Sequence, residues 1–333
     1  AGRWRRPRGC PTPPWSRPFD ADACAILQQV VSSFLIVAPE PLSGKTAVAV
    51  ALGQRFKDAG RTVALARLAG DGHADADAGL YAGLAFNDRR RPGPVEPQDA
   101  GTDADVTLIE APAGDARGLA ESLPARALVV AAYAHPLPAD LPSFCGALAD
   151  SCAGIVITRV PRRRLEATRA AAQSAIGGGA RLVALIPEDR TLAAPSLSAI
   201  AEALDAEATF PDSTREDVID RPIISSISTD PAQGYFARHA PNAVIVRGDK
   251  PDQQLGALNA GGPCRIVPGG RPVVSYVKDR AEEEEIPILG TPYDTVAAVQ
   301  RLEALYAATP FSGLAKVERA AQLAGELDIS SLD

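Results

Sequence analysis

Four consecutive residues, Ser-Gly-Lys-Thr at positions 43–46, are of the types that bind phosphate. Gly44 lets the chain approach a phosphate closely, and Lys45 adds a point charge at the β- and γ-phosphates. Thr46 offers a hydroxyl to Mg²⁺. The sequence therefore predicts a site for ATP and Mg²⁺, in which Lys45 is also catalytic. The residues expected to contact the nucleotide here are Leu42, Ser43, Gly44, Lys45 and Thr46.

The flanking residues place this loop between a strand and a helix. Phe34–Ala38 is wholly apolar, which is typical of a strand buried on both faces of a parallel sheet. Ala47–Ala59 is typical of a helix that ends at Gly60. The context is that of the Walker A pattern G-x-x-x-x-G-K-[ST], except that Pro39 stands at the first glycine. The alternative that this loop binds a nucleotide without hydrolysing it therefore remains.

Acidic residues follow the next two strands. Glu110 ends an apolar run, where an α/β sheet places a ligand for a metal or a water molecule, and we expect it to be catalytic. A solvated acid at a strand end is the alternative. Three further acids lie beside His73: Asp71, Asp75 and Asp77. They could hold Mg²⁺ or cap the helix that begins near Asp77, whereas His73 has no partner ligand nearby.

Strands and helices alternate along this part of the chain, which predicts an α/β fold with a parallel sheet covered by helices on both faces. The further strands expected are Thr62–Arg67, Asp105–Ala111, Ala127–Ala131, Gly154–Val160 and Arg181–Ile186. Further helices are expected near Arg163–Ile176 and Ser196–Leu204.

Residues 33–206 resemble the dethiobiotin-synthetase-like P-loop domain, which also forms the N-terminal region of long bacterial phosphotransacetylases. The segments that carry the resemblance are the loop ending at Thr46, Leu108–Gly114, Gly154–Val160 and Leu185–Leu192. The resemblance implies a P-loop NTPase domain over residues 32–206. It also implies that Lys45 binds phosphates.

The Mg²⁺ ligands implied by this resemblance are Thr46, Asp77 and Glu110. Two positions depart from the synthetase. Arg67 stands where the synthetase has a substrate lysine, and Thr158 stands at the asparagine that reads adenine. Thr158 is therefore the residue expected to contact the base, although it lacks the paired donor and acceptor of an amide. Both departures count against biotin chemistry.

A polar linker is expected over residues 207–221, within which Phe210 and Val218 could pack. Four strand–helix units follow, which predicts a smaller Rossmann-like α/β domain over residues 222–308. The expected strands are Pro222–Ile227, Ala243–Arg247, Cys264–Val267 and Pro287–Leu289. The expected helices are Pro231–His239, Asp249–Asn259, Pro272–Glu284 and Thr295–Ala307.

Residues 222–307 resemble the DRTGG domain, which occurs in the same phosphotransacetylases and in some nucleotide-regulated pyrophosphatases. The signature pieces here are Asp249-Lys250 and Pro268-Gly269-Gly270. Loops carrying Gly248, Gly269 and Asp294 should converge at one sheet edge and could bind a small-molecule effector. The acidic run Glu282–Glu285 is expected to be a solvated helix end.

Composition bounds the class of protein. The chain has 333 residues, enough for roughly two domains of about 150 residues each. Hydrophobic residues make up 46% and charged residues 23%, which is typical of a globular protein. A net charge of −7 argues against nucleic acid as a partner, and no apolar run approaches the roughly 20 residues of a membrane span. The five cysteines include no C-x-x-C pair, which favours a cytoplasmic location.

The two ends of the chain differ from the rest. Residues 1–18 hold five arginines, five prolines and no acid, so we expect residues 1–31 to be a disordered leader or sequence upstream of the true start. The chain has no methionine, and Val30 or Val31 could be the initiator. The tail, residues 309–333, should pack back on the body or form a dimer contact through apolar residues near a helical period. These are Leu314, Val317, Ala321 and Leu323.

Two functions from different classes fit these features. The first is a Mg-dependent, ATP-binding regulatory or sensor protein of the phosphotransacetylase-associated type, with weak ATPase activity at most. The second is an ATP-dependent ligase of the dethiobiotin-synthetase or cobyrinate-amidation type, which activates a carboxylate or carbamate. We do not expect acetyl phosphate synthesis, because no acetyl-transfer segment follows the second domain. A homo-oligomer stays open.

Overall fold

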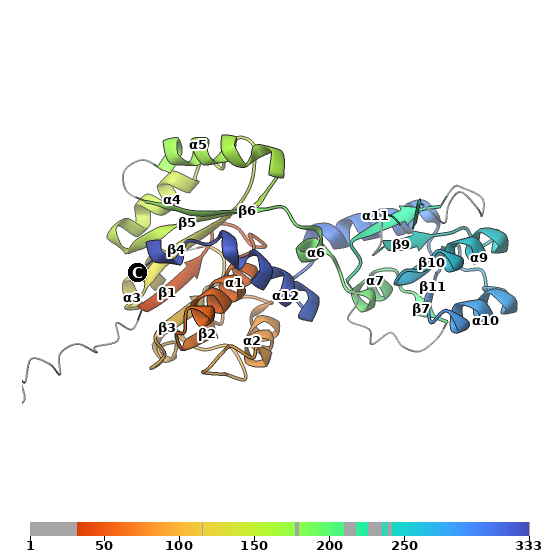
Figure 1. Ribbon diagram of the computed structural model, residues 1–333, viewed down its shortest axis with the longest axis horizontal. Helices are drawn as coiled ribbons and strands as arrows, with labels where there is room; N and C mark the ends of the chain where they lie inside the picture. Colours follow the sequence, from red (N-terminus) through yellow and green to blue (C-terminus); the bar gives the residue numbers. More distant parts are fainter. Residues whose placement is uncertain are drawn as a thin grey trace, which may run out of the picture.

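The computed structural model describes residues 32–114, 116–176, 180–209, 218–225, 235–236, 238 and 242–332. Figure 1 shows two lobes, each built on a sheet flanked by helices. The expected leader, the packing of Phe210 and most of the helix expected at Pro231–His239 lie outside the described residues. Within the ranges given, no helix combines the length and the apolar character that crossing a membrane requires.

Six parallel strands form the first sheet, in the order β2-β3-β1-β4-β5-β6. They are β1 (Ser32–Val37), β2 (Val63–Arg67), β3 (Val106–Glu110), β4 (Arg126–Ala132), β5 (Cys152–Val160) and β6 (Leu182–Pro187). Its helices are α1 (Lys45–Asp58), α2 (Ala74–Gly83), α3 (Arg117–Ser122), α4 (Leu141–Leu148) and α5 (Leu165–Ile176). The expected α/β fold class, with a parallel sheet between two helical layers, is confirmed.

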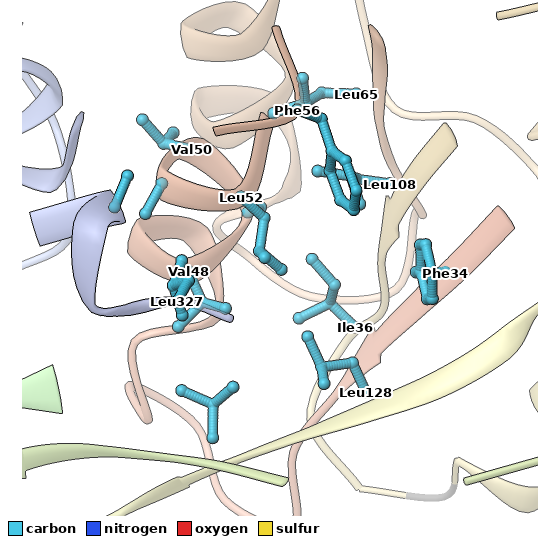
Figure 2. Packing of buried hydrophobic residues seen from close by; sticks show 14 of the residues in the cluster. Phe34, Ile36, Val48, Val50, Leu52, Phe56, Leu65, Leu108, Leu128 and Leu327 are labelled. Atoms are coloured by element: carbon cyan, nitrogen blue, oxygen red, sulfur yellow. The ribbon is translucent and has the colours of Figure 1, made fainter. Parts of the chain in front are cut away.

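Side chains of β1 alternate between two hydrophobic clusters, one on each face of this sheet. Phe34 and Ile36 join the cluster that includes α1 and α2, as Figure 2 shows for α1. Leu35 and Val37 join the cluster packed by α3, α4 and α5. Because both faces are covered, every residue of β3 is buried, including the polar Thr107 and Glu110.

The second sheet has five strands in the order β7-β11-β10-β9-β8, with β7 as an antiparallel edge. The strands are β7 (Glu207–Ala208), β8 (Arg221–Ile224), β9 (Asn242–Ile245), β10 (Cys264–Pro268) and β11 (Ile288–Thr291). Helices α7 (Leu197–Ala203) and α11 (Thr295–Ala308) pack on one face, and α9 (Pro251–Asn259) and α10 (Ser275–Glu283) on the other. The smaller α/β domain is therefore present as expected.

The chain between the lobes differs from the expected layout. Leu197 and Ile200 of α7 pack with the second sheet, and β7 is one of its strands, so the second domain begins before the expected boundary at residue 207. Their apolar side chains favour this sheet because they complete its hydrophobic face. The short helix α6 (Arg190–Ala193) leads into this domain.

After α11 the chain returns to the first lobe as α12 (Leu314–Leu323), which packs against α1. Ala320, Ala324 and Leu327 join the cluster of α1, and Figure 2 shows Leu327 there with Val48. The second domain is thus inserted into the first. Short 3-10 helices complete the fold: Pro97–Asp99, Ala149–Ser151, Arg162–Arg164, Ala324–Glu326 and Ile329–Ser331.

Candidate functional site

The phosphate-binding loop lies between β1 and α1, with α1 beginning at Lys45. Gly44 has φ +94° and caps this helix, a conformation that a residue with a side chain rarely adopts. A Cβ at Gly44 would lie 3.4 Å from Cγ2 of Thr158, so the loop also passes close to β5. The N-terminal amides of α1 therefore face the carboxyl edge of the sheet, as anion binding requires.

Lys45 and Thr46 occupy the first turn of α1 and are both buried. Burial lowers the pKa of Lys45, and the carboxylate of Glu110 partly opposes this effect. The Thr46 hydroxyl donates to Oε1 of Glu110 over 3.1 Å. The structure thus brings together the loop and the strand-end acid that the sequence predicted separately.

Glu110 is fully enclosed at the end of β3. Its neighbours across the sheet are Arg67 of β2 and Ile36 of β1. The Tyr81 hydroxyl donates to Oε2 of Glu110. The pKa of Glu110 is raised to about 7, first by burial and then by the charge of the nearby Asp77. The hydrogen bond from Tyr81 and the charge of Arg67 lower this pKa and so oppose part of the rise. Tyr81 was not predicted, because nothing in its sequence context marks it.

Arg67 lies among the acids. Its Nη2 is 2.5 Å from Oδ2 of Asp71, and its Nε is 3.1 Å from Oδ2 of Asp77 and 3.9 Å from Oε1 of Glu110. Burial raises the pKa of Asp77 more than Arg67 lowers it. For the less buried Asp71, the hydrogen bond and charge of Arg67 outweigh burial and lower the pKa. Asp75 is exposed.

The predicted Mg²⁺ ligands fit the ion by donor type and by charge. Thr46, Asp77 and Glu110 offer a hydroxyl and two carboxyl groups, and Mg²⁺ prefers oxygen ligands. Two cations, Lys45 and Arg67, face the carboxyl groups of Asp71, Asp77 and Glu110 at this edge. The surplus of acids favours an added cation. No group of three His, Cys, Asp or Glu side chains suited to a metal occurs in the described part of the chain, so substrate phosphates and water would complete the coordination.

Thr158 supports the loop. Its hydroxyl donates to the carbonyl of Ser43 over 2.6 Å, and Arg159 donates to the carbonyl of Leu42. Thr158 also lines the cavity beside the loop, and its contact with a nucleotide base stays a prediction. The Ser43 hydroxyl is 1% exposed and has no hydrogen-bond partner among the described residues. A ligand in the cavity could satisfy it.

The loop opens into a cavity of about 390 Å³, and its lining includes a charged group of side chains, here called the charged end, and an apolar group, here called the apolar end. The charged end is lined by Lys45, Thr46, Arg67, Asp77 and Glu110. The apolar end is formed by Ile186 and Leu192, which lie in and after β6, and by Tyr306, Phe311 and Leu323. Two acids of the same segment, Glu188 and Asp189, also line the cavity. Residues 306–323 follow the second domain, and sequence reasoning did not place them here because their position depends on how the tail packs.

The carboxyl edge of the second sheet has a different character. The Gly269 amide donates to the Tyr293 carbonyl over 2.7 Å, so the loops after β10 and β11 do meet. Asp249 pairs with the exposed Arg247, and Asp294 caps α11. The run Glu282–Glu285 is exposed. An effector site at this edge remains a prediction.

Comparison with known families adds one assignment. Residues 199–305 match the family model of the DRTGG domain. The match begins inside α7, in agreement with the packing of that helix on the second sheet. The expected DRTGG domain is confirmed.

Three solved structures are similar at low identity. The CBS and DRTGG domains of the regulatory region of Clostridium perfringens pyrophosphatase, complexed with the activator diadenosine tetraphosphate, are 20% identical with a TM-score of 0.29, over 33% of this chain and 46% of that chain. This chain thus spans about half of that region. The MinC:MinD cell division protein complex of Aquifex aeolicus is 18% identical with a TM-score of 0.37, over 48% of this chain and 83% of that chain. The septum site-determining protein MinD complexed with Mg-ADP, from Pyrococcus horikoshii OT3, is 18% identical with a TM-score of 0.35, over 48% of this chain and 83% of that chain.

Proposed function

We propose that this protein is a Mg-dependent, ATP-binding regulatory or sensor protein of the phosphotransacetylase-associated P-loop and DRTGG type, with weak ATPase activity at most. One observation carries the proposal: Lys45, Thr46 and Glu110 line a cavity that aromatic and aliphatic side chains also line. A nucleotide has the same two-part chemistry, a polyphosphate joined to an aromatic base.

Each residue has a definite task in this proposal. Lys45 and the amides of the first turn of α1 would bind the β- and γ-phosphates. Thr46, Asp77 and Glu110 would hold Mg²⁺, which neutralises phosphate charge when it is bound. Tyr81 and Arg67 orient Glu110 and favour its ionised form, so that it can hold the ion or a water molecule near the phosphates.

The regulatory part of the proposal rests on how the second domain is connected. The chain enters that domain after Leu192 and leaves it at Tyr306, and both residues line the cavity. Nucleotide occupancy and an effector at the DRTGG domain would therefore bias each other, because coupling between two sites is reciprocal.

The contacts of Arg67 disfavour a ligase. Its Nη1 donates to the Leu68 carbonyl over 2.7 Å, and its other nitrogens face Asp71 and Asp77. A substrate carboxylate would have to displace these partners. The experiment that follows therefore also tests the ligase hypothesis.

The test is calorimetric titration of the full chain with ATP, ADP and GTP, with and without Mg²⁺. We expect wild type to bind ATP more tightly with Mg²⁺, and Lys45→Ala to lose detectable binding because it removes the only side-chain cation of the loop itself. Lys57→Ala, on the same helix but paired with Asp88, is the matched control and should bind as wild type does.

Two results would contradict the proposal: no nucleotide binding by wild type, or equal binding by Lys45→Ala. Phosphate release that requires an added carboxylate substrate would favour the ligase. Phosphate release without one would support the weak ATPase activity.

A further inference from the structure

The apolar end of the cavity is completed by a segment that begins after the DRTGG match ends. Tyr306, Phe311 and Leu323 line this end, and the match stops at residue 305. We propose that residues 306–323 form the base-binding wall of the nucleotide site, so that the pocket is complete only when the chain has returned from the second domain. This inference rests on the proposed function and names the part of the site that distinguishes a nucleotide from a bare polyphosphate.

The chemistry of the wall suits an aromatic base. Tyr306 and Phe311 add two rings, and Ile186 and Leu192 add aliphatic surface from the opposite segment. Rings and aliphatic groups bind the faces of any base, and base stacking is largely independent of sequence. The charged residues of the loop lie at the other end, where the phosphates would go.

The wall is held in place by contacts on both sides. Arg319 of α12 bonds Oδ2 of Asp189 through Nε over 2.7 Å, which ties α12 to the segment after β6. Lys316 donates to the carbonyl of Pro310 over 2.8 Å and fixes the turn that carries Phe311. A wall held in position before the ligand arrives loses little conformational entropy on binding.

The same wall is connected to the second domain. The Tyr306 hydroxyl donates to the carbonyl of Ile219 over 2.6 Å, and Ile219 belongs to the hydrophobic core of the second sheet. A rearrangement of that core would therefore reach the base-binding wall through one side chain. Ligand binding at the wall and the conformation of the second domain would thus be coupled through this contact.

An independent feature indicates that the cavity holds a polar ligand. The buried Ser43 hydroxyl lines the cavity and has no partner within the described ranges. Buried polar groups are rarely left without a hydrogen bond, so a ligand atom is expected next to it. The polar and the apolar features therefore belong to one binding site.

The experiment compares two ligands that share the phosphates and differ in the base: ATP and inorganic tripolyphosphate, each titrated with Mg²⁺ into the full chain. Phe311→Ala should weaken ATP binding about tenfold, as loss of one stacking partner does. Its tripolyphosphate affinity should stay within about twofold of wild type. Leu314→Ala is the matched control, because Leu314 is 67% exposed at the start of α12.

A second pair of variants covers the case in which Phe311→Ala fails to fold, since Phe311 also packs against the core of the first domain. Tyr306→Ala removes a ring from the wall, whereas Tyr306→Phe keeps the ring and removes only the hydrogen bond to Ile219. We expect Tyr306→Ala to weaken ATP binding selectively and Tyr306→Phe to retain it.

Four results separate the possible failures. Equal loss of ATP and tripolyphosphate binding, or unchanged ATP binding in Phe311→Ala and Tyr306→Ala, would overturn the wall while leaving the nucleotide site intact. Wild type binding tripolyphosphate as tightly as ATP would do the same. Wild type binding neither ligand would overturn the proposed function itself.

Discussion

Four buried cations fall into two groups according to what surrounds them. Lys45 and Arg67 lie at the carboxyl edge of the first sheet among carboxyl groups. Arg265 and Lys316 lie elsewhere, and in the described part of the chain their hydrogen-bond partners are backbone carbonyls. Arg265 donates to the carbonyls of Ala257, Gly261 and Cys264, and Lys316 donates to that of Pro310.

These different partners distinguish cations of a binding site from cations that stabilise the fold. Arg265 is a residue of β10, and its guanidinium lies at the C-terminal end of α9, where the last carbonyls of a helix lack partners and attract a cation. Its two terminal nitrogens donate to carbonyls within the fold, whereas its buried Nε has no hydrogen-bond partner among the described residues. Lys45 and Arg67 line a cavity and face carboxyl groups whose ionisation depends on them. Burial of a charge is therefore a weak sign of function, whereas burial among opposite charges beside a cavity is a stronger one.

Arg67→Leu should cause the largest loss of stability. The variant leaves the carboxyl groups of Asp77 and Glu110 buried without their cation, which costs about 5 kcal/mol in the free energy of unfolding at pH 8. Glu110 already has a pKa of about 7, above the ordinary value of 4.5, so the folded state binds more protons than the unfolded state and stability falls as pH rises. Removing Arg67 raises this pKa further, so the loss should be much smaller at pH 6.

Denaturant unfolding of the full chain at pH 6 and pH 8 measures this effect, with Arg89→Leu at an exposed arginine as the control. A loss of equal size at both pH values would show that Arg67 acts through packing alone, and the division between the two groups of cations would then fail.

Arg265→Ala should cost about 4 kcal/mol, because it leaves a cavity and removes the guanidinium hydrogen bonds to the carbonyls of Ala257, Gly261 and Cys264. Arg265 is the largest of the fully buried side chains. Its cost should not change between pH 6 and pH 8, since no carboxyl group in the described ranges depends on it. Denaturant unfolding measures the loss, and calorimetry at a temperature where the variant is folded should give wild-type ATP affinity. Weaker ATP binding would place Arg265 in the functional group.

Much of the fold was predictable from the sequence, because buried strands of a parallel sheet have a continuous apolar character. Phe34–Ala38 illustrates this, since the end of β1 lies within one residue of that prediction. The mostly apolar Asp105–Ala111 also contains β3, whose two ends lie within one residue of the predicted bounds. The phosphate loop was predictable because its chemistry is local: glycine, lysine and threonine at fixed spacing before a helix. The match of Glu110 to Thr46 followed from the rule that strand ends meet at one edge.

What the sequence could not predict depends on contacts between distant residues. The tail has an amphipathic pattern, yet nothing local indicates that Phe311 lines the same cavity as Ser43. Arg265 lies within a strand, where an arginine would be expected to reach solvent, and its burial follows from the position of α9. Arg67 was read as a substituted substrate residue, whereas its acidic neighbours hold it inside the site.

Lys316 gives the smallest of these effects and the opposite pH dependence. It is 1% exposed, and burial lowers its pKa from 10.5 to about 8. Between pH 8 and pH 10.5 the unfolded state therefore binds more protons than the folded state, and the free energy of unfolding should rise with pH by up to about 3 kcal/mol. Lys316→Met, which keeps the length of the side chain and removes the charge, should lack this rise. Unfolding curves of wild type and variant across this range measure the difference, with Lys278→Met at an exposed lysine as the control. Parallel curves for wild type and Lys316→Met would mean that the Lys316 ammonium remains charged within the fold, and that the carbonyl of Pro310 compensates it as fully as carboxyl groups compensate Arg67.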